Sequence, residues 1–248
     1  MRKILITNDD GIMADGLIRL AKAAASFGEV YVVAPESERS AASHSISLRH
    51  SIDIYPEPDF PVPGIKAFSC SGTPGDCVRV GSLSVMPIRP DIVLTGINHG
   101  YNVASDVQYS ATVGGALEGV FQGYPSIAFS EGTELDYDIK EGANPHEITD
   151  HFLDSILEEY IDMPFREGMI LNVNFPPMPL TECKGILRDR KVSKGMIFRD
   201  EYDAIEELPG GGIRYMVNGK HMYEAEEGTD LRAVFDGYVS IGYVRNLC

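Results

Sequence analysis

The sequence predicts an α/β fold in which a mainly parallel β-sheet is covered by helices on both faces. Between residues 3 and 175, short strand-like runs rich in isoleucine and valine alternate with segments whose apolar residues recur at helical spacing. The strand-like runs are mostly apolar without period-two alternation, which is typical of parallel strands buried on both faces. Because strands and helices alternate, neighbouring strands are expected to be joined by right-handed crossovers.

The first part of the chain supplies the first of these elements. Apolar residues at helical spacing predict a helix between Leu17 and Phe27, with Gly28 as its C-terminal cap. A second helix is expected to begin at Thr73-Pro74, an N-cap followed by proline at the first helical position. The parallel strands are predicted at residues 3–7, 30–35, 91–96, 126–130 and 169–175.

Two further helices are expected between the later strands. An apolar stripe from Val113 to Phe121 predicts one, and Gly123 closes it. The segment "NPHE" at 144–147 offers Asn144 as N-cap and a glutamate three residues later, which is the spacing of a capping box for another helix.

Two stretches follow a different pattern. Residues 45–54, "SISLRHSIDI", alternate with period two, which predicts a half-buried, antiparallel strand. Residues 186–248 are charged and β-like, with a hairpin turn expected at 208–212 and a final strand at 237–244. We therefore divide the chain into a core, residues 1–185, and a β-rich C-terminal extension, residues 186–248, that is too poor in apolar residues for a core of its own.

Composition limits the function classes. The 248 residues, 44% of them hydrophobic and 23% charged, suit one soluble globular core with an appendage. The longest apolar runs are too short to cross a bilayer, and the chain enters its first strand without room for a secretory segment, so we expect a cytoplasmic protein without a membrane partner. The net charge of −16 would repel a polyanion, which argues against a nucleic-acid polymer as partner.

Cysteine and histidine give no sign of a soft metal site. Cys70, Cys77, Cys183 and Cys248 lack ligand spacing and are expected to be reduced thiols. No histidine pair is spaced for zinc. The chain also lacks the G-x-x-x-x-G-K-[ST] pattern of a P-loop nucleotide-binding site.

Oxygen-bearing side chains follow the predicted strands instead. Asn8, Asp9 and Asp10 follow the first strand, Ser40 lies in the loop after the second, and Asn98 lies in the loop after the third. Ligands of an open parallel sheet bind beyond the carboxyl ends of its strands. Each residue alone is compatible with a turn or a cap. Together, two carboxylates, a hydroxyl and a carboxamide are hard donors suited to Mg²⁺ or Mn²⁺.

A phosphate site is expected beside these donors. Ser110 and Thr112 stand at the start of a glycine-rich helix whose amide groups and dipole would receive phosphate oxygens. Thr112 taken alone is most simply an N-cap. His44 and His99 lie in the same loops, and both a structural role and donation to a phosphate remain open for them.

Seven segments in order give the chain a family resemblance. They are "ILITNDDGI", "VVAPESERSAASHS", "SGTPGDCV", "DIVLTGINHGYN", "DVQYSATVGGALEG", "LNVNFP" and "TDLRAVFDGYVSI", and together they resemble the SurE family of nucleotidases. The resemblance implies a Rossmann-like three-layer core and a metal-dependent phosphomonoesterase acting on nucleoside 5′- and 3′-monophosphates, with short polyphosphate as a substrate of some members. It also implies homodimers or homotetramers that exchange C-terminal segments.

The resemblance assigns roles to residues already collected at the strand ends. The ligands of one divalent ion per subunit, Mg²⁺ or Mn²⁺, fall on Asp9, Asp10, Ser40 and Asn98, with Asp9 and Asp10 as the catalytic pair. The phosphate and substrate site falls on Asn8, Ser43, Asn102, Ser110 and Thr112. One departure is Ala111, where the family usually has glycine, and alanine would crowd a backbone position with positive φ.

One other enzyme mechanism and one other class of protein are weighed against this interpretation. In an aspartyl-phosphate phosphatase Asp9 would be the nucleophile, but Gly11 stands where such enzymes carry a second aspartate. A phospho-receiver module would need an aspartate near Asn98 and a lysine after the fifth strand, which residues 172–177 lack.

Basic and aromatic side chains leave two questions open. A basic cluster formed by Lys184, Arg188, Arg190, Lys191, Lys194 and Arg199 is either a solvated strand face or subunit contact, or a source of charge near the substrate. The aromatic candidates for stacking on a base are Tyr101, Tyr109, Phe198 and Tyr202.

Overall fold

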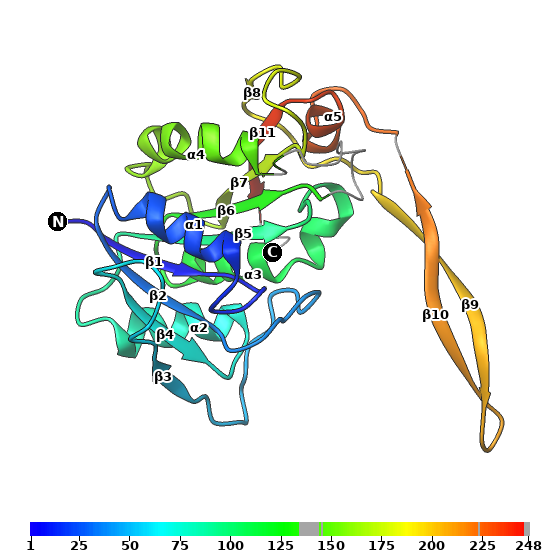
Figure 1. The fold of residues 1–248 in the computed structure, drawn as a ribbon, viewed down its shortest axis with the longest axis horizontal. Helices are drawn as coiled ribbons and strands as arrows, with labels where there is room; N and C mark the ends of the chain where they lie inside the picture. Colours follow the sequence, from blue (N-terminus) through cyan, green and yellow to red (C-terminus); the bar gives the residue numbers. More distant parts are fainter. Residues whose placement is uncertain (134–143, 145, 223, 246–248) are drawn as a thin grey trace.

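A computed structural model describes residues 1–133, 144, 146–222 and 224–245. Its main sheet has nine strands in the order β3-β4-β2-β1-β5-β6-β7-β11-β8 (Figure 1). The six strands from β4 to β7 in this order run parallel to one another. They are β4 (Lys66–Cys70), β2 (Glu29–Pro35), β1 (Lys3–Thr7), β5 (Ile92–His99), β6 (Ser126–Glu131) and β7 (Met169–Phe175).

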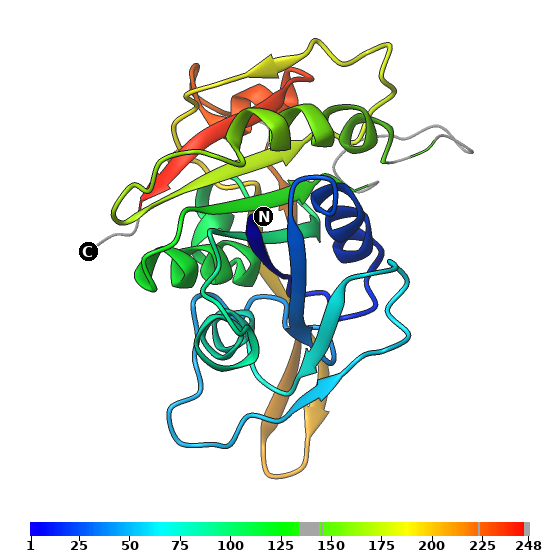
Figure 2. The same ribbon diagram turned by 90° about the vertical axis from the view of Figure 1, so that its left-hand side faces the viewer.

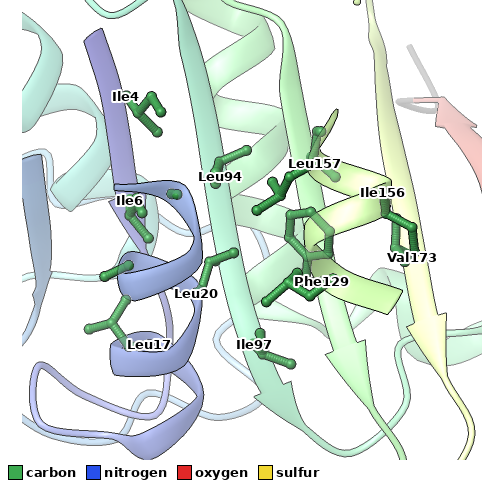
Figure 3. Close-up of a cluster of buried hydrophobic side chains, with 14 of the residues drawn as sticks. Ile4, Ile6, Leu17, Leu20, Leu94, Ile97, Phe129, Ile156, Leu157 and Val173 are labelled. Atoms are coloured by element: carbon green, nitrogen blue, oxygen red, sulfur yellow. The ribbon is translucent and has the colours of Figure 1, made fainter. Parts of the chain in front are cut away.

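Helices cover both faces of this sheet and make a three-layer α/β fold. Helices α1 (Asp15–Ala24) and α4 (Glu147–Tyr160) lie on one face, and α2 (Pro74–Val80) and α3 (Ala111–Phe121) lie on the other (Figure 2). Strand β1 shows why both faces are apolar: Ile4 and Ile6 join the cluster under α1 and α4, whereas Leu5 joins the cluster under α2. Figure 3 shows the first of these clusters, in which Leu17 and Leu20 of α1 and Leu157 of α4 lie over the sheet. The predicted mainly parallel sheet is confirmed.

The helix ends agree with the sequence in part. Thr73 caps α2 in a capping box with Asp76, and Gly123 takes a φ of +91° just after α3, as predicted. The prediction for Gly28 was wrong, because α1 ends at Ala24. Gly28 instead allows a close approach to the chain at Arg2, where a Cβ atom on residue 28 would lie 2.6 Å from the Arg2 carbonyl oxygen. Asn144 is likewise not an N-cap, since α4 begins at Glu147.

The predicted strand at 45–54 was also wrong. Only β3 (Ile54–Pro56) forms, antiparallel to β4, and the residues before it lie in a loop against the start of α2. There Asp76 accepts hydrogen bonds of 2.8 Å from both the Ser47 amide and the Ser47 hydroxyl, and Thr73 Oγ1 donates to the Ser45 carbonyl at 2.6 Å. These polar partners replace the strand ladder that period-two alternation implies.

The C-terminal segment divides between the main sheet and a separate hairpin. Strand β11 (Val239–Arg245) pairs antiparallel with β7 and parallel with β8 (Ile186–Leu187), and α5 (Asp230–Phe235) precedes it. The other two strands, β9 (Phe198–Leu208) and β10 (Gly212–His221), form a two-stranded sheet that extends away from the body (Figure 1). Gly210 and Gly211 have φ values of +79° and +82°, which confirms the predicted turn. The division at residue 185 stays a prediction.

The remaining short elements complete the description. A π-helical turn, η1 (Gly81–Val85), extends α2, and a 3₁₀ turn, η2 (Ala104–Gln108), leads into α3. Cys70, Cys77 and Cys183 are free thiols, and Cys248 lies outside the described residues. In the described part of the chain, no helix combines the length and the apolar character needed to cross a membrane.

Candidate active site at the strand ends

The strand order reverses between β1 and β5, and the predicted site residues lie at this point. From β1 the sheet grows in one direction through β2 and β4, and from β5 in the other through β6 and β7. Such a switch leaves a crevice beyond the carboxyl ends of the two central strands. Asp9 and Asp10 directly follow β1, and Asn98 is the second-last residue of β5. The topology therefore brings together residues that are far apart in the sequence.

Asp9, Thr112 and Asn98 form the centre of this crevice. The Thr112 hydroxyl donates a hydrogen bond to Asp9 Oδ1 and lies 3.3 Å from Asn98 Oδ1. The Asn98 amide nitrogen donates to the Gly100 carbonyl at 2.9 Å, so the carboxamide presents its oxygen toward Thr112. Three oxygen-bearing side chains, from the loop after β1, from β5 and from α3, thus converge on one point.

Burial makes the two carboxylates costly to ionise. Only 4% of Asp9 is exposed, and burial raises the pKa of Asp9 from 3.8 to about 7, against the hydrogen bond from Thr112 and together with the neighbouring charge of Asp10. Burial also raises the pKa of Asp10, although the backbone and the charge of His99 act in the opposite direction. A positive charge at this place would stabilise both anions.

A cavity of about 380 Å³ opens beside these residues. Its wall includes Asp9, Ser40, Asn98, Asn102 and Ser110, so five of the predicted site residues share one cavity. Among the other predicted residues, Asn8, Asp10, Ser43 and Thr112 do not line it. Thr112 contacts the site through its hydrogen bond to Asp9. Asp10 follows Asp9 in the chain, and Ser43 lies three residues after Ser40.

The loop that carries Ser40 and Ser43 is held against α3 in an unusual backbone conformation. Ala41 and Ser43 have φ values of +56° and +53°, a region that non-glycine residues seldom adopt. The Ser43 amide donates to the Tyr109 carbonyl at 3.0 Å. Backbone strain of this kind is found at sites where the surroundings hold the chain in place.

A part-buried hydrogen bond anchors the same loop to α3. His44 Nε2 lies 2.8 Å from Glu118 Oε2, and the Glu118 side chain is 4% exposed. Gln122 donates to the other carboxylate oxygen of Glu118 at 2.8 Å. His44 therefore serves the structure, as a partner of Glu118, and is absent from the wall of the cavity.

Hydrogen bonds to two asparagines of β7 hold the backbone of Asn102 in place. Its amide donates to Asn174 Oδ1 at 2.8 Å, and its carbonyl accepts from Asn172 Nδ2 at 2.8 Å. The side-chain amide of Asn102 donates to Ser130 Oγ at 2.8 Å. This network explains why a strand as apolar as "LNVNF" carries two asparagines at buried positions.

The start of α3 also agrees with a phosphate site. Ser110 is the N-cap of the helix and accepts a hydrogen bond from the Val113 amide at 3.1 Å. Thr112 lies inside the first turn, so the simple interpretation of Thr112 as the N-cap was wrong. Ala111 is the first helical residue, where alanine is well tolerated, and the concern about a missing glycine does not apply.

The donor set fits a hard divalent cation. Asp9 and Asp10 supply carboxylates with raised pKa values, and Asn98 turns its carboxamide oxygen toward Asp9 through Thr112. Asn8 Oδ1, the next acceptor along the chain, is buried and has no hydrogen-bond partner among the described residues. Those residues also hold no group of three or more histidine, cysteine, aspartate or glutamate side chains.

Sequence reasoning missed part of the cavity wall. Ser105 and Asp106 come from η2, Met196 comes from the segment that leads into the hairpin, and Asp200 lies on β9. Tyr101, Tyr109 and Phe198 of the aromatic candidates line the cavity, but Tyr202 does not. Only knowledge of where β9 starts relative to β5 would have identified Met196 and Asp200.

The named side chains of the basic cluster lie away from the cavity at Asp9. Arg188 pairs with Glu159 at 2.5 Å, and Lys194 and Arg199 line a different cavity of about 740 Å³. The Lys184 ammonium donates to the Asp236 carbonyl at 2.6 Å. None of these side chains lines the cavity at Asp9.

Comparisons with known proteins find one family along most of the chain. The family described as Survival protein SurE matches residues 4–195. A 5′-nucleotidase SurE of Gemmatimonas aurantiaca is 39% identical over 96% of this chain and 90% of its own length. Another, from Trichodesmium erythraeum, is 37% identical over 96% and 90%. The crystal structure of the SurE protein from Aquifex aeolicus superposes with a TM-score of 0.79 at 32% identity, covering 99% of this chain and 94% of that one.

Proposed function

The chain belongs to the Survival protein SurE family, and we propose that it is a metal-dependent 5′-nucleotidase that hydrolyses nucleoside 5′-monophosphates to nucleoside and phosphate. One observation carries the proposal: the buried carboxylate of Asp9 lies beside Asp10 at the switch point of the sheet and accepts a hydrogen bond from the first turn of a helix that can receive a phosphate. Nucleoside 3′-monophosphates present the same terminal phosphate and belong to the proposal.

One divalent ion per subunit, Mg²⁺ or Mn²⁺, would be held by Asp9, Asp10, Ser40 and Asn98. When bound, such an ion offsets the charge of the phosphoryl oxygens and lowers the pKa of a bound water. Thr112 occupies Asp9 Oδ1, which leaves Asp9 Oδ2 for the ion and for the proton of the attacking water.

The phosphate would lie between the carboxylates and the start of α3. Ser110, Asn102 and the free amides of the first helical turn would bind its outer oxygens, with Ser43 and Asn8 as further contacts. Thr112 orients Asp9 and Asn98 toward the same point. The positive end of the helix dipole stabilises the charge that spreads over these oxygens during transfer.

The β9–β10 hairpin gives a physical basis for the expected oligomer. It leaves the body of the subunit, and Tyr202, Ile213, Tyr215 and Val217 on it are between 48% and 66% exposed (Figure 1). An isolated two-stranded hairpin is marginally stable in water, and so large an apolar surface is typical of an interface. We propose that hairpins exchange between subunits of a homodimer or homotetramer, in the cytoplasm.

Phosphate release from nucleoside monophosphates tests the proposal. Wild type, Asp9→Asn and the control Asp59→Asn would be assayed with Mg²⁺, with Mn²⁺ and with EDTA. Asp59 lies on an exposed loop, so its variant matches the charge change without touching the site. We expect metal-dependent release in wild type and control, and a loss of at least about 100-fold in Asp9→Asn.

Two outcomes would contradict the mechanism. Full activity of Asp9→Asn would exclude the carboxylate from any essential role. A phosphorylated aspartate trapped during turnover would make Asp9 the nucleophile, as in an aspartyl-phosphate phosphatase. Absence of release from every nucleotide with either metal would reject the nucleotidase itself.

A further inference from the structure

Glu38 contacts one of the proposed ion ligands from outside the cavity. It lies two residues before Ser40, and the Ser40 hydroxyl donates a hydrogen bond to Glu38 Oε1 at 2.7 Å. Ser40 lines the cavity at Asp9, whereas Glu38 does not. The Glu38 carboxylate therefore contacts the wall of this cavity through the serine.

The residue between Glu38 and Ser40 is bonded to two other segments of the chain. The Arg39 amide donates to the Asp9 carbonyl at 2.7 Å. The Arg39 guanidinium donates to the Ser71 carbonyl at 3.0 Å. Because both the backbone and the side chain of Arg39 have partners, the flanking residues Glu38 and Ser40 have restricted positions beside Asp9.

The negative charge of Glu38 is felt at both aspartates of the proposed ion site. Burial is the first cause of the raised pKa of Asp9 and of Asp10, and the charge of Glu38 raises the pKa of both further. For a cation at this place the same proximity is favourable, because opposite charges attract. An ion of charge +2 gains twice as much from Glu38 as each aspartate loses at the same distance.

The hydrogen bond to Glu38 also changes what Ser40 can offer to an ion. A serine hydroxyl has one proton to donate and two lone pairs. Donation of the proton to Glu38 leaves both lone pairs of Ser40 Oγ available for coordination. A charged acceptor makes this hydrogen bond stronger than one to a neutral group, and partners of this kind orient a metal ligand and raise its basicity.

From this geometry we propose that Glu38 is a positioning residue of the ion site, which holds the Ser40 hydroxyl so that its lone pairs are free for a divalent ion. The inference rests on the proposed nucleotidase function and adds a residue that is not among the four proposed ligands. Without Glu38, the Ser40 hydroxyl rotates freely and loses a charged acceptor, so Ser40 becomes a weaker and less ordered ligand.

The size of the effect follows from the exposure of Glu38. Loss of a residue that supports a metal ligand typically lowers metal affinity by about 10- to 100-fold. Glu38 is exposed, so water and salt screen its charge. We therefore expect a smaller effect, with ion binding weakened about 3- to 10-fold when the carboxylate is removed.

The test titrates Mg²⁺ and Mn²⁺ into the full-length protein in a calorimeter, which measures ion affinity without turnover. Glu38→Ala removes both the charge and the acceptor, whereas Glu38→Gln keeps an acceptor oxygen. Glu36→Ala is the matched control, because Glu36 is exposed two residues away and does not line the cavity. Ser40→Ala, alone and combined with Glu38→Ala, completes a double-mutant cycle.

The expected result is a loss of ion affinity that depends on Ser40. Glu38→Ala should weaken binding about 3- to 10-fold and Glu38→Gln should weaken it less, while Glu36→Ala stays within about twofold of wild type. In the Ser40→Ala background, Glu38→Ala should have no further effect, because the hydroxyl that Glu38 holds is absent. The unfolding temperature of Glu38→Ala without ion should match wild type, and its rise on addition of Mn²⁺ should be smaller.

Three outcomes would overturn the inference and leave the nucleotidase function intact. They are wild-type ion affinity in Glu38→Ala, an equal loss in Glu36→Ala, and the same loss from Glu38→Ala whether or not Ser40 is present. Absence of ion binding by wild type, together with no phosphate release from nucleoside monophosphates, would instead overturn the proposed function itself.

Discussion

Replacing Gly114 by alanine should damage the site while leaving the protein folded. Gly114 lies in α3, where the loop carrying Ser40 and Ser43 crosses the helix. A Cβ atom at residue 114 would lie 2.5 Å from the Ser43 carbonyl oxygen, 2.8 Å from His44 Cα and 2.9 Å from the His44 nitrogen. All three neighbours are backbone atoms, so no side-chain rotation can relieve the overlap and the loop must move.

The magnitude follows from these distances. Ordinary contacts begin at 3.4 Å, so the loop must withdraw by about 1 Å. Overpacking of this kind costs about 1–3 kcal/mol, and the gain from alanine over glycine in a helix returns about 1 kcal/mol. We therefore expect the free energy of unfolding to fall by at most about 2 kcal/mol. A 1 Å displacement of groups that hold the ion and the phosphate can cost about 100-fold in rate.

The assay pairs urea unfolding with kcat/KM for a nucleoside monophosphate. The matched control is Gly119→Ala, one and a half turns along the same helix, whose Cβ would overlap Ser126 Oγ and contact Val93 at 3.0 Å, away from the site loop. We expect both variants to lose a similar amount of stability and only Gly114→Ala to lose activity, by about 10- to 100-fold. Activity of Gly114→Ala within about twofold of wild type would refute the reasoning, as would an equal loss in the control.

Two other substitutions test the electrostatics. Thr112→Val removes the hydroxyl that donates to Asp9, and a hydrogen bond to a charged group is worth about 1.5–3 kcal/mol. The metal concentration for half-maximal activity should therefore rise about 10- to 100-fold in a Mg²⁺ or Mn²⁺ titration. An unchanged midpoint would contradict this role of Thr112. Glu131→Gln breaks the buried ion pairs that Glu131 makes with Arg19 and His146. Burial alone would raise the pKa of Glu131, but the hydrogen bonds from His146 and Arg19 outweigh burial and keep that pKa low. Glu131 in turn raises the pKa of His146. The stability from Glu131 is present above its unfolded pKa of about 4.5 and is lost as pH falls through its folded value; the stability from His146 is present below about 6.5 and is lost as pH rises through its raised folded value. Urea unfolding should show a loss of roughly 3 kcal/mol at pH 5.5 and a smaller loss at pH 8.5, and equal losses would contradict the coupling.

The sequence predicts the core of this fold well because burial on both faces leaves a plain signal. "VYVVAP" and "DIVLTG" can hardly be anything except buried parallel strands, and their ends then identify Asp9 and Asn98 as neighbours. The alternating pattern at 45–54 predicted a strand wrongly, because the conformation of this segment depends on one residue that is distant in the sequence. Asp76 binds the Ser47 backbone and hydroxyl, and no local pattern in the loop indicates that partner.

The candidate site likewise has residues whose position the sequence predicts and residues whose position it does not. Chemistry-bearing residues such as Asp9, Asn98 and Ser110 follow strands or open a helix, so their position is encoded locally. Met196 and Asp200 come from a segment whose path depends on the packing of the C-terminal chain, and sequence reasoning missed them. The conformations of Ala41 and Ser43 are also hidden, because neither residue type favours positive φ.

The burial of Asp9 gives a physical reason for the fixed conformation of the loop that carries Ala41 and Ser43. A carboxylate that is 4% exposed beside another carboxylate destabilises the fold unless its surroundings are held in place. Thr112 donates a side-chain hydrogen bond to Asp9. Helix α3, which carries Thr112, also holds the Ser40 loop through the close contact at Gly114 and the contact of His44 with Glu118. The helix thus positions the oxygen donors from β1 and from the loop relative to its own N-terminus. A single rigid element therefore couples the ion site to the phosphate site, which is why perturbing Gly114 on that helix should disturb both at once.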